Sequence, residues 1–450
     1  MQPAQSVMEL AIESLGYQGE GVARLPDGRV VFVPFALPGE RVTVQLAREK
    51  KTHAFASLRQ VHTSSPDRVH PPCPVFTRCG GCSGQHMRYQ AQLAFKRQAV
   101  ADNLRKIPGA ETAVQPVTNM DDPWRYRNKT TWQVKQQNGK PVAGFFAVNS
   151  HELVSTDDCL IAHPTSAAAV RAVLAWMEKH GICEPASADG AGMVRQITTR
   201  VNEASDLMVI LTLSCAGLPH QADLIAMLQA ALPRLQSVCL SHSLLSGDEE
   251  DSGQTVCVHG REYLIEQLEG LRIRLSPASF YQVNHHMTRK MYAHAIRRAV
   301  NSPDDVVIDI YSGVGTMSLL VARAANTVFG LELAGSSVRD AEYNARANGI
   351  ANARFIQGPA ETELAKLLET GIQPDAVILD PPRQGAHPRV LQAILKAAPA
   401  RLVYISCHPA SQARDTRLLL QGGYQMLECQ PFDMFAQTAR VENVITLIRS

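Results

Sequence analysis

One cysteine near the C-terminus has the surroundings expected of a nucleophile. Cys407 follows the apolar run 403–406, and Asp380 ends a similar run directly before Pro381 and Pro382. Parallel strands end at the same rim of an open α/β sheet, and ligands bind at that rim. A thiol there beside a carboxylate suggests covalent catalysis. The alternative is a buried cysteine that acts only as a small apolar side chain.

A turn upstream of Cys407 indicates a nucleotide-like cofactor. Tyr311 opens a turn that contains Gly313 and Gly315, which let the backbone bend tightly and approach a ligand. Glu332 ends the next apolar run, where a carboxylate accepts hydrogen bonds from ribose hydroxyls. Ser318 stands where a dinucleotide site would have a third glycine. A cofactor without a pyrophosphate, such as S-adenosylmethionine, therefore fits this turn better.

The elements that must position these residues alternate in type. We predict strands at 306–311, 327–332, 375–380 and 402–406, and helices at 316–325, 336–348, 388–398 and 411–421. This alternation is typical of a doubly wound parallel sheet, so the sequence predicts a Rossmann-like domain over 271–450.

The front of the chain has a different pattern. Residues 1–62 contain short alternating stretches at 29–34, 40–46 and 54–58, separated by glycines, with 48–51 at a hairpin tip. This pattern is typical of an OB-like barrel that binds nucleic acid. Residues 1–140 carry 19 Lys+Arg against 11 Asp+Glu, or +8, whereas the whole chain carries only +2. Such a basic front half favours a polyanionic partner.

Between these parts we expect a mixed α+β domain over 63–270. The patterns predict helices at 88–107 and 165–180, strands near 130–136, 142–148, 194–201 and 207–214, and an acidic loop at 246–253.

A cluster of cysteines in this middle domain suggests a metal site. Cys73, Cys79 and Cys82 fall within ten residues, and zinc is possible, although zinc ribbons usually have two Cys-x2-Cys pairs. An iron–sulfur cubane needs a fourth thiolate, for which Cys159 is the best candidate. The residues expected only to pack are Cys183, Cys215, Cys239 and Cys257.

Length and composition exclude several classes. The chain has 450 residues, with 45% hydrophobic and 19% charged, which is ordinary for a globular protein of two to four domains. No apolar run reaches the ~18 residues of a membrane span, and the start lacks a secretory signal. We therefore expect a cytoplasmic protein with no membrane partner.

Taken together, the motifs resemble those of the TRAM-containing, iron–sulfur family of RNA uracil-5-methyltransferases, over nearly the whole length. The matching segments, in the family's order, are the barrel, the cysteine stretch with Gln85-His86, WRYRNK at 124–129, FYQVN at 280–284, the turn at 309–315, DPPR at 380–383, Ser406-Cys407 and VEN at 441–443.

The resemblance implies roles for individual residues. It implies a class I methyltransferase domain in which Gln282, Tyr311, Glu332 and Asp380 contact S-adenosylmethionine, together with the glycine turn. Cys407 would be the nucleophile and Glu442 the general base. A [4Fe-4S] cluster, mainly structural or RNA-positioning, would be held by Cys73, Cys79, Cys82 and Cys159.

Methylation of uracil at C5 explains why these groups are needed. A thiolate added to C6 makes C5 electron-rich, and a base then removes the C5 proton after methyl transfer. The uridine must leave its stack, so we expect a flipped-out base in an RNA loop. Arg383 would bind uracil oxygens or phosphate, or form a plain salt bridge. Two departures are Arg440, where the family usually has His, and Ser312, where Cys is frequent.

The substrate expected from the resemblance is large-subunit (23S) rRNA, with tRNA as the nearest alternative. Two other hypotheses are a noncatalytic RNA-binding protein with a relic methyltransferase fold, which intact Cys407 and Glu442 disfavour, and an iron–sulfur redox enzyme, which the missing flavin or dinucleotide motif disfavours. We expect a monomer, although the sequence specifies neither the oligomeric state nor the number of target uridines.

Overall fold

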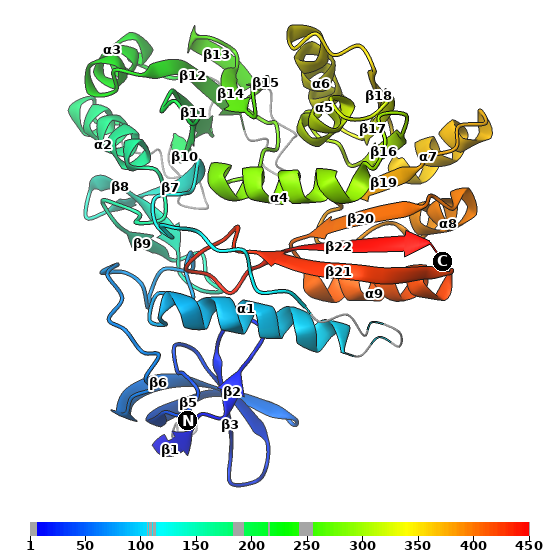
Figure 1. The fold of residues 1–450 in the computed structure, drawn as a ribbon. Helices are drawn as coiled ribbons and strands as arrows, with labels where there is room; N and C mark the ends of the chain where they lie inside the picture. Colours follow the sequence, from blue (N-terminus) through cyan, green and yellow to red (C-terminus); the bar gives the residue numbers. More distant parts are fainter. Residues whose placement is uncertain are drawn as a thin grey trace.

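The computed structural model describes residues 7–105, 107, 110, 114–182, 193–214, 217–242 and 255–449. Three sheets and a hairpin are formed in this part of the chain. In Figure 1 the N-terminal sheet lies at the bottom, the central sheet at upper left and the C-terminal sheet at right. None of the helices in the described residues has the length and apolar character of a membrane span.

The N-terminal sheet curls around its own small apolar core. Its strands are β1 (Val7–Ala11), β2 (Ser14–Leu15), β3 (Gly21–Arg24), β4 (Val30–Val33), β5 (Arg41–Glu49) and β6 (His53–Thr63), in the order β1-β5-β6-β4-β3-β2. Three register shifts interrupt the β5–β6 pair and bend it, so that alternate side chains enclose the core. The three predicted strands and the hairpin tip are confirmed.

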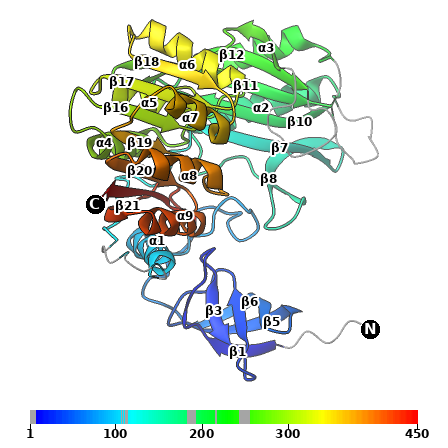
Figure 2. The same cartoon turned by 90° about the vertical axis from the view of Figure 1, so that its right-hand side faces the viewer.

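Helix α1 (Tyr89–Leu104) connects the N-terminal sheet to the rest of the molecule (Figures 1 and 2). Lys96, on its buried face, has no exposed side chain and forms an ion pair with Asp433 of the C-terminal domain. The Lys96 ammonium also donates to the carbonyl of Phe435 at 3.0 Å. The predicted helix at 88–107 is thus confirmed, and it is anchored to the C-terminal domain by a buried charge pair.

The central domain combines a seven-stranded sheet with two helices. Its elements are β7 (Lys129–Gln137), β8 (Lys140–Phe146), β9 (Leu153–Ser155), α2 (Pro164–Lys179), β10 (Val194–Val201), β11 (Leu207–Leu213), α3 (Gln221–Ala231), β12 (Leu235–His242) and β13 (Thr255–Gly260). The sheet order is β13-β12-β11-β10-β7-β8-β9. The predicted strands and helix are confirmed here, whereas Cys183, Cys215 and the loop at 246–253 lie outside the described residues.

The C-terminal domain contains a second seven-stranded sheet. Its elements are a hairpin of β14 (Leu264–Leu268) and β15 (Leu271–Leu275), then α4 (His285–Ala299), β16 (Val306–Ile310), α5 (Thr316–Ala322), β17 (Thr327–Glu332), α6 (Gly335–Ala347), β18 (Ala353–Gln357), α7 (Ala360–Glu369), β19 (Ala376–Leu379), α8 (Pro388–Ala397), β20 (Arg401–Ser406), α9 (Pro409–Gln421), β21 (Tyr424–Phe432) and β22 (Glu442–Arg449).

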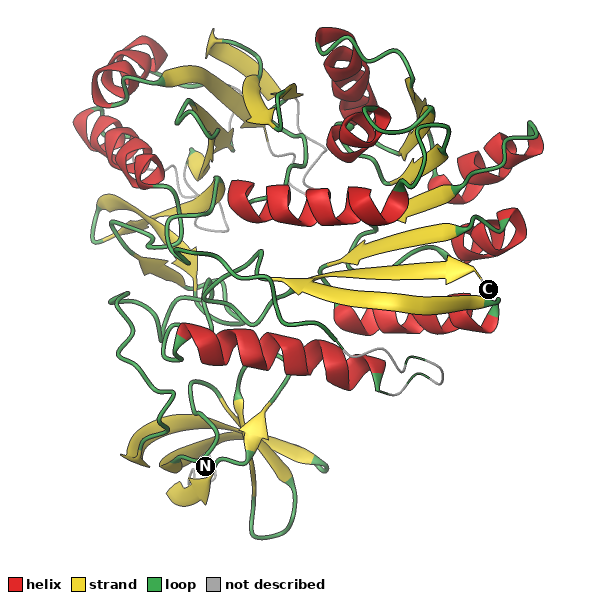
Figure 3. Ribbon diagram, viewed as in Figure 1, coloured by secondary structure: helices red, strands yellow, loops and turns green. Residues whose placement is uncertain are grey.

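The order of this sheet is β18-β17-β16-β19-β20-β22-β21. The first five strands are parallel, and β22 and β21 complete the sheet in antiparallel pairing. One apolar cluster covers the face under α4 and α5, and another covers the face under α7, α8 and α9. Figure 3 shows helices on both sides of these strands. The predicted doubly wound fold is confirmed.

The elements of this domain that were not predicted are the β14–β15 hairpin, α4, β18, α7 and the β21–β22 hairpin. The predicted division at 270 and 271 falls at the turn between β14 and β15. There Glu269 and Gly270 both have positive φ, 49° and 74°, as a two-residue hairpin turn of type I′ requires.

Candidate active site

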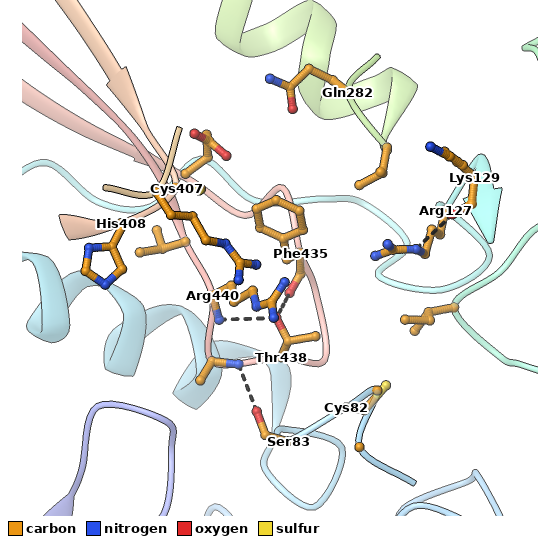
Figure 4. A pocket seen from close by; sticks show the side chains of 18 of the residues that line it. Cys82, Ser83, Arg127, Lys129, Gln282, Cys407, His408, Phe435, Thr438 and Arg440 are labelled. Carbon is orange, nitrogen blue, oxygen red and sulfur yellow. Dashed lines mark hydrogen bonds between the residues drawn. The ribbon is translucent and has the colours of Figure 1, made fainter. Parts of the chain in front are cut away.

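A cleft of 2510 Å³ is lined by residues of all three sheets. The predicted site residues on its wall are Cys73, Cys79, Cys82, Cys159, Gln282, Tyr311, Gly313, Glu332, Asp380, Cys407 and Glu442. Gly315 is not among the lining residues. In Figure 4, Cys407 and Arg440 lie on one side of the cleft, Gln282 and Arg127 on another, and Cys82 below them.

Cys407 is the first residue after β20, at the carboxyl end of the sheet. Because β19 and β20 are parallel neighbours, their ends bring Asp380 and Cys407 to the same rim, as the sequence predicted. Burial, together with the charges of Glu442 and Asp380, raises the pKa of the Cys407 thiol to about 11. Arg383 opposes this shift through its charge and a side-chain hydrogen bond to the thiol. In the free protein the thiol is therefore protonated at neutral pH.

Glu442 begins β22, which is paired in antiparallel fashion with β20. Ser406 is in register with Asn443, so Glu442 enters the cleft next to Cys407. Glu442 is only 3% exposed, and burial, followed by the charge of Asp380, raises the pKa of its carboxyl well above the usual value. The charge of Arg383 lowers this pKa but does not offset burial, so the carboxyl is protonated in the free protein.

The register of β22 is fixed by a buried polar network. Asn443 Nδ2 donates to Gln412 Oε1 at 2.7 Å, and Gln412 Nε2 donates to the carbonyls of Tyr404 and Asn443 at 2.8 and 3.2 Å. Both side chains are buried, so the network ties β20, β22 and α9 into one unit. Glu442 and Cys407 therefore keep a constant relative position.

The glycine turn holds the shape needed by a cofactor. Tyr311, Gly313 and Gly315 all have positive φ, and a Cβ on Gly315 would lie 2.7 Å from Phe355. A Cβ on Gly313 would meet no atom within 4 Å, so the backbone there faces open space. The Glu332 carboxylate accepts hydrogen bonds from the backbone of Gly313 at 2.9 Å. The turn is therefore packed against Phe355 at Gly315 and open to a ligand at Gly313.

Two further carboxylates stand at this end of the cleft. Burial, and then the neighbouring charge of Asp309, raises the pKa of Asp380 to about 7. Burial also raises the pKa of Asp309 to about 6, and Ser318 Oγ donates to this carboxylate at 2.5 Å. Ser318, the residue in place of a third glycine, thus has a structural role. Gln282 Nε2 donates to Asp380 at 3.4 Å, so these two predicted cofactor contacts meet each other.

The four cysteines of the predicted metal site line another part of the same cleft. Burial, together with the charges of Cys159, Cys79 and Cys73, raises the pKa of Cys82 to about 12. Burial likewise raises the pKa of Cys159, with added contributions from Cys79 and Cys73. The four thiols are thus electrostatic neighbours. Among the described residues, however, no group of three or more Cys, His, Asp or Glu side chains is arranged to hold a metal ion.

The loop that carries Cys73, Cys79 and Cys82 is hydrogen-bonded to the segment that leads into β22. The amides of Ser83 and Gly84 donate to the carbonyl of Gln437 at 3.1 and 2.9 Å, and the amide of Ala439 donates to Ser83 Oγ at 2.9 Å (Figure 4). We call these contacts the loop clamp. It connects the cysteine end of the cleft to the residues directly before Glu442.

Several residues of the cleft were not assigned a site role from the sequence. Tyr17 of the β2–β3 loop lines the cleft and packs against His408. Arg127 also lines it, near Arg440, whose pKa is lowered by partial burial and by the like charges of Arg383 and Arg127. The only local signal for Arg127 is its position in the WRYRNK segment. Nothing in the local sequence indicates that Tyr17 reaches this site.

The fold and the site together define a class I methyltransferase joined to an N-terminal RNA-binding barrel. Residues 245–450 match the family model described as tRNA (uracil-5-)-methyltransferase, and residues 5–58 match the TRAM domain.

Full-length relatives agree with this assignment. The chain is 39% identical to an uncharacterized RNA methyltransferase of Caldanaerobacter subterraneus subsp. tengcongensis, over 98% of each protein. It is 38% identical to one of Halalkalibacterium halodurans, over 98% of this chain and 96% of the relative. It therefore belongs to the TRAM-containing family of RNA uracil-5-methyltransferases, and it is an S-adenosylmethionine-dependent enzyme.

A solved structure has the same architecture. The tRNA (uracil-54, C5)-methyltransferase of Pyrococcus abyssi, in complex with S-adenosyl-L-homocysteine, superimposes with a TM-score of 0.80 at 25% identity. The match covers 98% of this chain and all of that one. The predicted barrel and methyltransferase domains are thus confirmed. The residues around the glycine turn suit S-adenosylmethionine, because the turn leaves space at Gly313 and has carboxylates at Glu332 and Asp380.

Proposed function

We propose that this enzyme methylates C5 of a flipped-out uridine through a covalent bond between Cys407 and uracil C6. The observation that carries this proposal is the β20–β22 pairing, which brings the thiol of Cys407 and the carboxyl of Glu442 to the same part of the cleft. A nucleophile and a base are both required for this reaction, and both come from elements fixed by the same polar network.

The proposed steps assign one task to each side chain. The Cys407 thiol gives its proton to solvent, helped by the adjacent Arg383 cation, and its sulfur bonds to C6, so that the C5–C6 π electrons move toward the O4 carbonyl. When bound, S-adenosylmethionine would supply a methyl group from its sulfonium to C5 and leave as the neutral thioether S-adenosylhomocysteine. Glu442, after loss of its own proton to solvent, removes the C5 proton as a carboxylate, the C5–C6 double bond returns, and the sulfur leaves as a thiolate.

Glu442 suits the base role because burial makes its carboxylate a stronger base than an exposed one. Burial raises its pKa, so a carboxylate formed there holds a proton strongly once it has taken one. Arg440 and Arg383 supply positive charge beside the pair, where we propose that they hold uracil oxygens or a flanking phosphate.

Trapping with 5-fluorouridine RNA tests the covalent step. Fluorine at C5 leaves no proton to remove, so the methylated adduct persists and migrates as a protein–RNA complex in a denaturing gel. Wild type and Cys257→Ser should trap, and Cys407→Ser should not. Failure of wild type to trap with rRNA and tRNA transcripts and S-adenosylmethionine would refute the proposal.

We further propose that Gln282, Tyr311, Glu332 and Asp380, with the turn at Gly313 and Gly315, bind S-adenosylmethionine. Isothermal titration with S-adenosylhomocysteine tests this set. Asp380→Asn should weaken binding by about 10-fold or more, because a hydrogen-bonded charge in a buried site is lost. Asp304→Asn, on an exposed loop, is the matched control and should bind like wild type.

We also propose a [4Fe-4S] cluster on Cys73, Cys79, Cys82 and Cys159. Burial raises the pKa of three of these thiols, Cys79, Cys82 and Cys159, and such thiols gain from a cationic cluster that stabilises their thiolates. Anaerobically purified protein should be brown and contain four iron atoms per chain, and Cys79→Ser should lose them. A colourless preparation that contains zinc would overturn this part.

For the substrate we propose large-subunit rRNA, with tRNA as a second candidate. The similarity to the Pyrococcus enzyme supports tRNA as the second candidate, because that enzyme is a tRNA methyltransferase and its fold matches this chain over its full length. Mapping 5-methyluridine in the rRNA and tRNA of a deletion strain distinguishes them. Loss from 23S rRNA supports the proposal, whereas loss from tRNA alone refutes it.

We also propose that the domains span 1–62, 63–270 and 271–450, and that the enzyme is a monomer. Light scattering tests the monomeric state.

A further inference from the structure

A tyrosine of the N-terminal barrel reaches the catalytic end of the cleft. Tyr17 lies in the loop between β2 and β3, and its ring centroid is 5.9 Å from that of His408, with an angle of 68° between the rings. His408 directly follows Cys407. Two domains that are distant in sequence therefore contribute adjacent side chains at the site of reaction.

The loop that carries Tyr17 is held in a defined shape. Gly16 and Gly19 are linked by a backbone hydrogen bond of 3.0 Å, and Gly16 also donates to the carbonyl of Glu20 at 2.7 Å. Gly19 has a φ of 82°, and a Cβ at this position would lie 3.5 Å from that of Ala439. The loop is thus a tight turn that rests against the segment leading to Glu442.

The ring of Tyr17 is supported on one edge and open elsewhere. His408 is fixed because its Nδ1 accepts a hydrogen bond from the amide of Ser411 at 3.2 Å, as the N-cap of α9. Tyr17 itself is 49% exposed although it lines the cleft. An exposed aromatic ring braced by a fixed neighbour is a ready surface for a flat ligand.

The charges near this ring match a nucleic acid strand. Tyr17, Arg383 and Arg440 line the same cleft. Partial burial and Cys407 raise the pKa of Tyr17, while the charges of Arg383 and Arg440 lower it. Guanidinium groups bind phosphates, and aromatic rings stack on unpaired bases. A uridine that leaves its stack also exposes the faces of the bases beside it.

We propose that Tyr17 stacks on the base of a nucleotide adjacent to the reactive uridine and so positions the RNA strand for Cys407. This inference rests on the proposed function, because it assumes that the target uridine reaches Cys407. It makes Tyr17 a positioning residue: the barrel then does more than hold RNA by charge, since it sets the register of the strand in the active site.

A double-mutant cycle, in which protein variants are combined with RNA variants, tests the proposal. The substrate is a synthetic RNA hairpin that carries the uridine mapped in the deletion strain, together with versions that lack one base at each flanking position. Tyr17→Ala should reduce kcat/KM for the intact hairpin by about 5- to 100-fold, mainly through KM. Tyr17→Phe should stay within about 2-fold of wild type, because it keeps the ring, and so should the exposed Leu427→Ala on β21.

The abasic hairpins identify the stacking partner. At one flanking position, removal of the base should lower wild-type activity and abolish the further effect of Tyr17→Ala. An equal loss on every hairpin, or no loss with Tyr17→Ala, would overturn the inference. If Tyr17 only supports His408, Tyr17→Ala will add nothing in a His408→Ala background, which also overturns it.

The wild-type trapping assay separates the two proposals. If wild type fails to form the 5-fluorouridine adduct, the proposed function fails. If wild type forms the adduct and Tyr17→Ala binds and methylates the hairpin equally well, only the stacking role fails. Equal melting temperatures of wild type and Tyr17→Ala will show that the substitution leaves the fold intact, as the exposure of this side chain leads us to expect.

Discussion

Asn443 pairs with Ser406 across the β20–β22 ladder, and this single register brings Glu442 beside Cys407. A slip by one residue would turn Glu442 to the other face of the sheet. The proximity of nucleophile and base therefore depends on an antiparallel strand added to an otherwise parallel sheet.

Replacement of the base should separate the steps of the reaction. We expect Glu442→Gln to methylate C5 but to release RNA slowly, because the C5 proton remains. The turnover should fall by about 10²- to 10⁴-fold, the usual contribution of a general base. A covalent protein–RNA complex should accumulate with unmodified RNA, as a denaturing gel will reveal. The exposed Glu369→Gln should behave like wild type, and a loss of activity without the complex would contradict this role.

The reactivity of Cys407 should rise with pH. Its pKa of about 11 lies above the ordinary 9.0, so the thiolate fraction in the free enzyme grows about 10-fold per unit between pH 7 and pH 9. Alkylation by iodoacetamide, followed at the Cys407 peptide by mass spectrometry, should follow that slope. Arg383→Gln removes the cation that lowers this pKa, so it should slow alkylation several-fold at each pH. The exposed Arg389→Gln in α8 should not.

Gly315 of the glycine turn and Gly349, just after α6, offer a matched pair of substitutions. Gly315 and Gly349 both have positive φ, 81° and 66°, but only a Cβ on Gly315 would clash, with Phe355. Gly349→Ala should therefore cost only the strain of the left-handed conformation, about 1 kcal/mol. Gly315→Ala should cost more, about 2–4 kcal/mol, and weaken S-adenosylhomocysteine binding. Denaturant unfolding and calorimetry measure both, and equal effects would contradict the packing argument.

The buried pair of Lys96 and Asp433 should be a major determinant of stability. Lys96→Met leaves the Asp433 carboxylate buried without its cation, which should reduce the free energy of unfolding by about 3–5 kcal/mol. Tyr89, whose hydroxyl donates to Asp433 at 2.7 Å, offsets only part of this loss. The double variant Lys96→Met, Asp433→Leu should be more stable than Lys96→Met alone. Melting temperatures of the three proteins check this order.

Local patterns were sufficient for most of the fold. The alternation of apolar runs predicted β16, β17, β19 and β20, because buried parallel strands are apolar throughout. β18 was missed because Ala353–Gln357 is an edge strand with Arg354 and Gln357 exposed, which leaves no apolar run to detect. The hairpin of β21 and β22 was missed because strand direction depends on tertiary pairing.

The site was predictable only in part for a similar reason. Cys407 and Asp380 end adjacent parallel strands, and this relation follows from sequence order. Glu442 could be recognised only from its motif, since its burial arises from a register between strands. Tyr17 gave no signal at all, because its contact with His408 joins parts of the chain that only folding brings together.

The loop clamp also makes the two ends of the cleft mechanically continuous. Ser83 and Gly84 hold Gln437 and Ala439, and Glu442 follows a few residues later. A change in the conformation of the cysteine loop would therefore act first on residues 437–441, which lead into β22, while the pairing of β22 with β20 stays in place.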